Sequence, residues 1–298
     1  TGTVLIRIRD NGNLAYGQTH TLFECPGASL QGVAPQNFRV EGPLNGVVEV
    51  TASTVQLRIT GYPVVFVNAA ATGANNGTSW QDAYTDLQAA LSSGAPQDIW
   101  VAEGTYRTSQ GTTSQDRNIS FILKNGVRLY GGFPASGNPV FADRNPHAHR
   151  TVLLGRLPNN NPAWHVVTAP NTNASAVLDG FVITGGRAYG APGNRDNAGG
   201  GIYISAGSPS IANCQFVDNH ALVGGAMMCE NNSSPTFINC TFAGNTATVG
   251  GAAGGAGYTS GGNPRFLNCT FAGNSAVTGG ALFFGGPGQV RNSIFWAN

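Results

Sequence analysis

The stretch PTFINCTFAGNTATVGGA (235–252) decides the fold, because the chain repeats it almost unchanged on both sides. PSIANCQFVDNHALVGGA (209–226) precedes it, PRFLNCTFAGNSAVTGGA (264–281) follows it, and a shorter copy, GQVRNSIFWAN, occupies 288–298. The phenylalanines that begin the F-x-x-N tetrapeptide of successive copies are 26, 29 and 24 residues apart, which is the period of solenoid proteins. The regular repeat at 209–298 therefore predicts an architecture of stacked, similar coils.

The side chains within one copy alternate in character, as they do in a β-strand. Cys240 and Phe242 are expected on one face of the backbone, with Thr241 and Ala243 on the other, because this alternation has a period of two. Short strands between Asn and Gly bends, repeated at this interval, predict a parallel β-helix. Strands of neighbouring coils then lie about 4.8 Å apart, so that equivalent residues form ladders. The predicted ladder residues are Phe216, Phe242, Phe271 and Phe295; Asn219, Asn245, Asn274 and Asn298; and Cys214, Cys240 and Cys269.

Each ladder has an expected role. The phenylalanine rings stack in the core, and each asparagine amide bonds to the asparagines of the coils above and below. The cysteines are expected to be small apolar core residues, because in-register side chains point in parallel and suit a disulfide poorly. The five cysteines of the chain fit neither a zinc pattern nor a disulfide framework. We therefore expect free buried thiols in the ladder, with Cys25 and Cys229 filling gaps elsewhere.

An imperfect copy of the repeat comes before the regular ones. The segment LDGFVITGG (178–186) aligns with IANCQFVDN and places Phe181 over Cys214 and Ile183 over Phe216. The repeat pattern therefore extends toward the N-terminus of the chain beyond residue 209.

The insert RAYGAPGNRDNA (187–198) is longer than the equivalent segment of any other coil, so we expect it to protrude as a loop. It contains the candidates for a carbohydrate contact, which are Arg187, Tyr189, Arg195 and Asp196. The competing interpretation is a solvated surface loop, in which the adjacent Arg195 and Asp196 form an exposed ion pair of small energetic value.

One segment of the first half has helical periodicity. In TSWQDAYTDLQAALSSG (78–94) the apolar residues mark one face of a helix. Ser79 is a plausible N-cap with Asp82 at the capping-box position, and Gly94 followed by a proline would end the helix. We therefore expect a helix at about 79–93 that covers the open hydrophobic end of the solenoid.

The chain is expected to have two domains. Residues 63–298 carry the β-helix and its capping helix, whereas residues 1–62 contain alternating runs such as TVLIRIRD with a turn signal at Asn11-Gly12. A small antiparallel β-domain is the expected structure of residues 1–62, and additional starting coils are the alternative.

Two motifs of the repeats resemble a known family. FVDN, FAGN, FAGN and FWAN, which begin at the four ladder phenylalanines, match an FxxN motif, and GGAM, GGAA and GGAL resemble GGA[ILV]. These motifs are typical of the polymorphic outer-membrane proteins of chlamydiae and of related bacterial surface proteins. Within Phe66–Gly132, VNAAATGANNGTSWQDAYTDLQAAL and IWVAEGTY resemble the N-terminal part of right-handed, pectate-lyase-like β-helices. The resemblance covers about residues 64–298 and implies an all-β fold, a right-handed parallel β-helix.

The resemblance also implies a location and a role. It favours a secreted or surface-displayed bacterial protein that serves as a scaffold, an adhesin or a filament subunit and has no catalytic activity. Self-association or contact with other surface proteins is then expected. The alternatives are a protein that binds or cleaves polysaccharide along the flank of the β-helix, and a segment of a phage or spike fibre.

The composition narrows the remaining chemistry. The net charge is +1 and the chain has no basic run, so we expect no contact with nucleic acid. The sequence contains no run of about 20 apolar residues, so we expect no membrane-spanning helix. Residues 151–298 contain four acidic residues, Asp179, Asp196, Asp218 and Glu230, which fall at different places around the coil. Because a glycoside hydrolase needs paired carboxylates and a calcium site needs a carboxylate cluster, we expect no catalytic residue, cofactor or metal ligand.

Overall fold

The computed structural model describes residues 4–7, 19–24, 33–41, 45–51, 53–61, 63–92, 97–191, 195–249 and 254–298. The chain forms two compact units, one of Thr1–Val64 with Ala95–Asp98, the other of Val65–Gly94 with Ile99–Asn298. The predicted turn at Asn11-Gly12, Cys25, the predicted helix end at Gly94 and the GGAA segment (250–253) lie outside the described residues.

The first unit contains a small antiparallel sheet. Its strands are β2 (Thr19–Glu24), β5 (Thr54–Gly61) and β4 (Asn45–Val50), in that order, with Val48, Val55 and Leu57 buried. A separate pair, β1 (Val4–Arg7) and β3 (Phe38–Glu41), is parallel rather than antiparallel, and the short 3₁₀ turn η1 (Pro35–Asn37) precedes β3. Alternating hydrophobicity predicts a strand but not the direction of its partner, which explains this difference.

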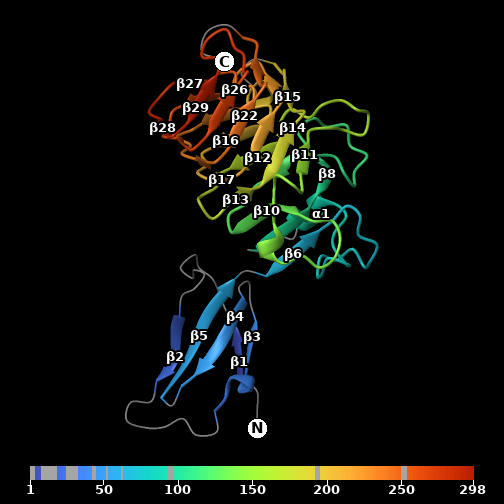
Figure 1. Ribbon diagram of the computed structural model, residues 1–298, viewed down its shortest axis with the longest axis vertical. Helices are drawn as coiled ribbons and strands as arrows, with labels where there is room; N and C mark the ends of the chain where they lie inside the picture. The colour runs from blue at the N-terminus through green and yellow to red at the C-terminus, as the bar shows by residue number, and fades with distance from the viewer. Residues whose placement is uncertain are drawn as a thin grey trace. The chain divides into compact units, whose positions relative to one another are not determined.

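The second unit is a parallel β-helix whose coils pass through three long sheets in turn (Figure 1). Sheet 1 consists of β6 (Val64–Val67), β7 (Gln97–Ala102), β10 (Val127–Phe133), β13 (Val177–Asp179), β17 (Ser210–Ala212), β21 (Thr236–Ile238), β25 (Arg265–Leu267) and β28 (Gln289–Arg291). Sheet 2 consists of β8 (Gly104–Arg107), β11 (Thr151–Leu154), β14 (Phe181–Thr184), β18 (Gln215–Val217), β22 (Thr241–Ala243), β26 (Thr270–Ala272) and β29 (Ile294–Trp296). Sheet 3 consists of β9 (Phe121–Ile122), β12 (Val167–Pro170), β16 (Ile202–Ser205), β20 (Met227–Glu230), β24 (Gly257–Ser260) and β27 (Leu282–Phe284).

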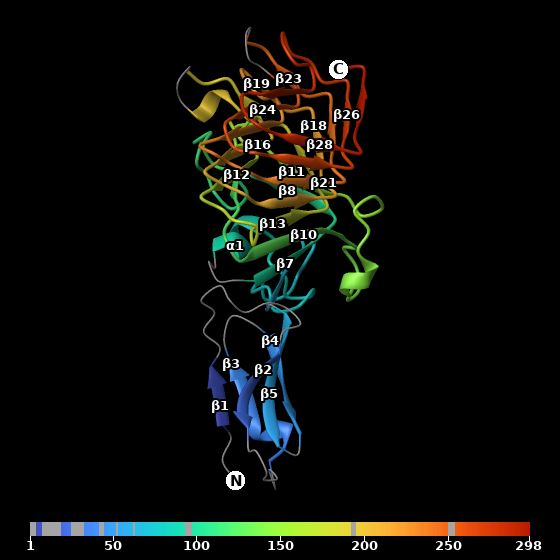
Figure 2. The same cartoon turned by 90° about the vertical axis from the view of Figure 1, so that its left-hand side faces the viewer.

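Successive coils lie one above another, so each strand pairs in parallel with its equivalent in the next coil (Figure 2). A short fourth sheet of β15 (Arg187–Ala188), β19 (His220–Ala221) and β23 (Thr246–Ala247) follows sheet 2. Two 3₁₀ turns, η2 (Phe141–Asp143) and η3 (Arg195–Asn197), lie in the longer connections. The prediction of an all-β, parallel β-helix is confirmed.

Aromatic rings fill the core of the repeat. Phe216, Phe242, Phe271 and Phe295 are in register in sheet 2, and their ring centroids are 4.9, 5.0 and 4.7 Å apart in near-parallel planes. A second stack, which lies outside the F-x-x-N motif, joins Phe237 to Phe266 in sheet 1 with 4.9 Å between the ring centroids. The two stacks meet edge to face, with 5.6 Å between the rings of Phe237 and Phe242. Burial of the other five rings stabilises the fold by about 1.5–3 kcal/mol each, whereas Phe295, the last ring of the sheet 2 stack, is 49% exposed and differs from the expected core position.

Three members of the asparagine ladder, Asn219, Asn245 and Asn274, are buried inside the coil, and Asn298 is exposed. Asn219 Nδ2 donates to Asn245 Oδ1 at 3.2 Å, Asn245 Nδ2 to Asn274 Oδ1 at 2.9 Å, and Asn274 Nδ2 to Asn298 Oδ1 at 2.7 Å. Each Oδ1 also accepts the backbone N–H of the preceding ladder asparagine, at 3.0–3.2 Å. The ladder therefore satisfies the buried backbone groups of the bend after sheet 2, where no strand can do so.

A second asparagine ladder lies at the bend between sheets 1 and 2. Asn239 Nδ2 donates to Asn213 Oδ1 at 3.2 Å and Asn268 Nδ2 donates to Asn239 Oδ1 at 3.3 Å. These three residues have φ angles of 50, 53 and 54°, in the left-handed region that asparagine tolerates better than most residues. Their identity is therefore explained by backbone conformation, with the exposed amide chain as a further contact.

The three ladder cysteines are free and buried, as is Cys229. Their thiols approach backbone carbonyls, for example 3.6 Å from Cys214 Sγ to Leu178 O and 3.4 Å from Cys240 Sγ to Ile238 O. Burial raises the pKa of Cys214 to about 12 and also raises the pKa of Cys240. The thiols of Cys214 and Cys240 therefore stay protonated at neutral pH and act as core side chains.

The helix predicted at 79–93 is shorter than expected, because α1 spans only Leu87–Ser92. The predicted capping contact exists, since Ser79 Oγ accepts the Asp82 N–H at 3.0 Å. However, the chain then becomes extended, and Tyr84 forms a parallel bridge to Val67. Asp86 Oδ1 accepts the Gln88 N–H at 2.9 Å at the actual start of the helix. Pairing with the first coil therefore overrides the helical preference of residues 79–86, while Leu87, Ala90 and Leu91 still join the core.

Candidate ligand-binding cleft

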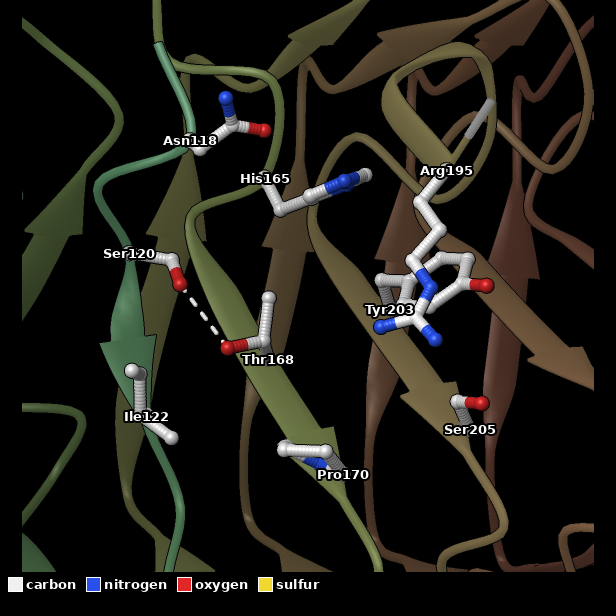
Figure 3. A pocket seen from close by; sticks show the side chains of 9 residues that line it. All are labelled: Asn118, Ser120, Ile122, His165, Thr168, Pro170, Arg195, Tyr203 and Ser205. Carbon is white, nitrogen blue, oxygen red and sulfur yellow. Dashed lines mark hydrogen bonds between the residues drawn. The ribbon is translucent and has the colours of Figure 1, made fainter. Parts of the chain in front are cut away.

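A cleft of about 190 Å³ lies on the outer face of sheet 3, where β9, β12 and β16 run side by side (Figure 3). Three consecutive coils contribute to it, together with η3 from the insert at 187–198. The lining residues are Asn118, Ser120, Ile122, His165, Thr168, Pro170, Arg195, Tyr203 and Ser205.

Strand register brings the floor of the cleft together. Ile122, Thr168 and Tyr203 are aligned across β9, β12 and β16, and Pro170 is aligned with Ser205 in the adjoining row. Ser120 and Thr168 share a hydrogen bond of 2.9 Å between their hydroxyl oxygens. The floor therefore offers hydroxyl groups beside the apolar surfaces of Ile122 and Pro170.

Arg195 supplies the positive charge of the cleft. It is exposed, and its side chain extends from η3 toward sheet 3, where the guanidinium lies beside the Tyr203 ring (Figure 3). Among the described residues, no hydrogen-bond acceptor or carboxylate pairs with this guanidinium. Since no Asp or Glu lines the cleft, its charge is available to a ligand.

His165 forms part of the wall and is almost fully buried. Its Nδ1 lies 3.0 Å from the Gly199 carbonyl oxygen and therefore carries the proton that it donates. The His165 ring packs 5.1 Å from the Tyr203 ring. Burial lowers the pKa of His165 below its ordinary value, and the positive charge of Arg195 acts in the same direction. His165 is therefore a neutral, fixed side chain at neutral pH.

Tyr203 is held from the opposite side by Glu230. The phenol donates a hydrogen bond to Glu230 Oε1, which also accepts from Asn231 Nδ2 at 3.0 Å and from Ser205 Oγ at 3.4 Å. Burial and the charge of Glu230 both raise the pKa of Tyr203. Tyr203 therefore presents a protonated phenol whose proton is already donated, and Glu230 is occupied by three donors.

Of the four residues predicted as ligand candidates, only Arg195 lines the cleft. Arg187 lies in β15 and donates to Asp218 Oδ2 at 3.1 Å and to the Asp218 carbonyl oxygen at 2.5 Å. Asp218 also pairs with His220 at 2.8 Å. Burial raises the pKa of Asp218, but these hydrogen bonds outweigh that effect and lower it. Arg187 therefore stabilises the bend before β19.

Tyr189 and Asp196 lie away from the cleft lining. Tyr189 is 41% exposed. Asp196 Oδ1 is buried and has no hydrogen-bond partner within the described part of the chain. The expected exposed ion pair with Arg195 is wrong in this respect, because the Asp196 side chain turns inward and lies against Gly190.

Sequence reasoning missed most of the cleft. His165, Thr168, Ser120 and Asn118 come from coils outside the regular repeat, and the repeat motifs do not single out Tyr203 either. The available signal was the alternation of WHVVTA (164–169), which is typical of a strand and places Thr168 on one face of it. This signal does not indicate which outward residues of three coils meet.

Comparison with known proteins supports the fold. Residues 171–298 match the family model described as Right handed beta helix region. This part of the chain is a right-handed β-helix. Comparisons with curated proteins and with solved structures give no match.

Two further observations concern the described residues of the β-helix and of the first unit. No helix among them is long and apolar enough to span a membrane. No three His, Cys, Asp or Glu side chains among them lie close enough together to hold a metal ion.

Proposed function

We propose that the protein is an extracellular bacterial surface protein whose β-helix serves as a scaffold, in an adhesive or filament-forming role without a reaction of its own. The observation that supports this proposal is the continuous register of the ladders. From Phe216 to Phe295 and from Asn219 to Asn298, each coil repeats the residues that hold it to the next.

Repeated contacts of this kind stabilise a long and stiff β-helix. Each coil buries its inner face only against its neighbours, so the chain extends by stacking. The core rings and buried amides are held by packing, whereas the outward side chains of the strands face away from it and can contact partners. A stiff support that displays its outer face to partners is the role that this arrangement suits best.

Labelling of cells from the native source tests the location. Antibody against the purified chain should label the surface of intact cells in immunogold electron microscopy. Permeabilised cells are the matched control. Label that appears only after permeabilisation would contradict the surface location.

Electron microscopy of material purified from the native source tests the assembly. Polymers with a regular repeat would identify a filament subunit and the self-association that we propose. Separate rods, together with partner proteins recovered by crosslinking at the cell surface, would identify an adhesin or scaffold instead. Separate rods without any surface partner would contradict both roles.

A second candidate function is binding of polysaccharide along the flank, and the cleft on sheet 3 favours it. Hydroxyl groups, an apolar strip and one unpaired cation together suit a saccharide. Glycan binding by the full chain, measured on immobilised polysaccharides, tests this function. Release of soluble sugar from the bound polymer would extend it from binding to cleavage.

A further inference from the structure

The arginines near the cleft differ in how their charge is used. Arg117 donates to the carbonyl oxygens of Pro162 at 2.8 Å and Arg187 at 2.9 Å, and its guanidinium lies 3.2 Å from the centre of the Trp164 ring. Arg187 pairs with Asp218. These side chains are bound within the fold, whereas Arg195 points into the cleft with no partner among the described residues. An arginine with five donors and no acceptor is the side chain best suited to an oxyanion.

The residues next to Arg195 are held in place by specific contacts. The Gly190 N–H donates to the Asp196 carbonyl oxygen at 2.9 Å, which joins the two ends of the insert next to Arg195. A Cβ on Gly190 would lie 2.1 Å from Asp196 Cγ, so only glycine allows the Asp196 side chain to occupy this place. The buried His165 forms the wall beside Arg195 and is fixed by its bond to Gly199. The contacts of Gly190, Asp196 and His165 therefore give the position of Arg195 at the cleft fixed neighbours.

The other lining residues indicate which class of ligand would carry the negatively charged group. Ser120, Thr168 and Ser205 offer hydroxyl groups, and Asn118 offers an amide. Ile122 is 45% exposed and, with Pro170, gives an apolar strip beside them. A sugar ring has hydroxyl groups at its edge and C–H groups on its faces, so it matches both parts of this surface. The volume of about 190 Å³ is below the roughly 300–1,000 Å³ of pockets for larger ligands, and suits one sugar unit.

We propose that this cleft binds a sugar unit that carries a carboxylate or sulfate group, with the oxyanion on the Arg195 guanidinium and the ring over β9, β12 and β16. The inference names the ligand of the second candidate function and rests on it. The scaffold role does not depend on it. Among the lining side chains Arg195 makes the difference between an acidic and a neutral sugar.

Calorimetric titration of the full chain tests the proposal. The probes are glucuronate, glucose 6-sulfate, glucose and inorganic sulfate. Arg195→Gln removes the charge and Arg195→Lys keeps it. Arg265→Gln, at an exposed position of sheet 1, removes the same charge outside the cleft. Circular dichroism of each variant shows that it is folded.

We expect glucuronate or glucose 6-sulfate to bind at least about tenfold more tightly than glucose, because charge-assisted hydrogen bonds are the stronger ones. Arg195→Gln should remove this preference, Arg195→Lys should keep part of it, and Arg265→Gln should leave it unchanged. The more strongly bound of the two acidic sugars identifies the source of the anion.

The other outcomes overturn distinct parts of the proposal. Glucose that binds as tightly as the acidic sugars, or binding that survives Arg195→Gln, would leave carbohydrate binding in place and refute the role of the anion. Inorganic sulfate that binds through Arg195 while no sugar binds would refute the saccharide. No binding by any probe would refute both the inference and the second candidate function.

Discussion

At the residue scale, Asn245 shows why a polar side chain can belong to the core of a β-helix. Its Nδ2 donates to Phe216 O and to Asn274 Oδ1, both at 2.9 Å, and its Oδ1 accepts from the backbone N–H and from Nδ2 of Asn219. The residue is fully buried. Each of these groups would otherwise be a buried polar atom without a partner, which costs about 1–3 kcal/mol.

Replacement of Asn245 should therefore be severe. Asn245→Ala leaves the Asn219 N–H and the Phe216 carbonyl without partners, so we expect the free energy of unfolding to fall by about 3 kcal/mol or more. Guanidinium denaturation followed by circular dichroism measures the change. Asn268→Gly is the matched control, because this residue is exposed, has a φ of 54° and makes one ladder bond. A loss for Asn245→Ala no larger than that of the control would show that the buried ladder contributes little.

His165 makes stability depend on pH in a predictable direction. Burial lowers its pKa in the folded state below the ordinary value of about 6.5, so the unfolded state binds the proton first as the pH falls. Stability should therefore decrease as the pH falls below about 6.5 and should level off below the folded-state pKa. In His165→Asn, whose amide can still donate to Gly199, this component disappears. Parallel denaturation curves of both proteins between pH 5 and pH 8 measure the difference, and a constant difference would contradict the assignment.

At the element scale, the sequence predicted the coils better than their connections. Residues equivalent to Cys240 and Phe242 recur in each copy because these positions of every coil face the same core. Periodicity alone therefore predicts that they are core residues. The prediction of a helix at 79–93 was wrong for its first part, because Tyr84 forms a parallel bridge with Val67 of the first coil. Local capping signals at Ser79 and Asp82 cannot report this long-range pairing.

The insert at 187–198 offers a test of one element. Gly190→Ala places a methyl group 2.1 Å from Asp196 Cγ, so we expect a loss of about 1–3 kcal/mol as the loop is displaced. In Gly190→Ala/Asp196→Ala the obstructing carboxylate is absent, so the double variant should be more stable than the sum of the two single changes predicts. Thermal and guanidinium unfolding of the four proteins measures the coupling. Additive losses would show that this contact does not determine the loop conformation.

At the scale of the whole molecule, the cleft exists only because three coils and an insert meet. Thr168 and Tyr203 are 35 residues apart and become neighbours only through the register of β12 and β16. Arg195 could be selected from the sequence as a loop cation, but only the fold shows that its side chain extends toward sheet 3 (Figure 3). Sequence periodicity therefore predicted the β-helix fold, whereas the lining of the cleft could be identified only from the folded structure.

The stacking of coils also predicts how the molecule unfolds. Cys214, Cys229, Cys240 and Cys269 are all buried, and a thiol reacts only as an exposed thiolate. In a Cys25→Ser background, these four thiols should resist thiol reagents in the native protein and react after denaturation. Because no coil buries its inner face alone, we expect all four to become reactive over the same range of guanidinium, as read by mass spectrometry after pulsed labelling. Labelling of Cys269 at clearly lower guanidinium than Cys214 would show instead that the coils separate one after another, and that the ladders between Phe216 and Phe271 transmit stability less than their continuous register implies.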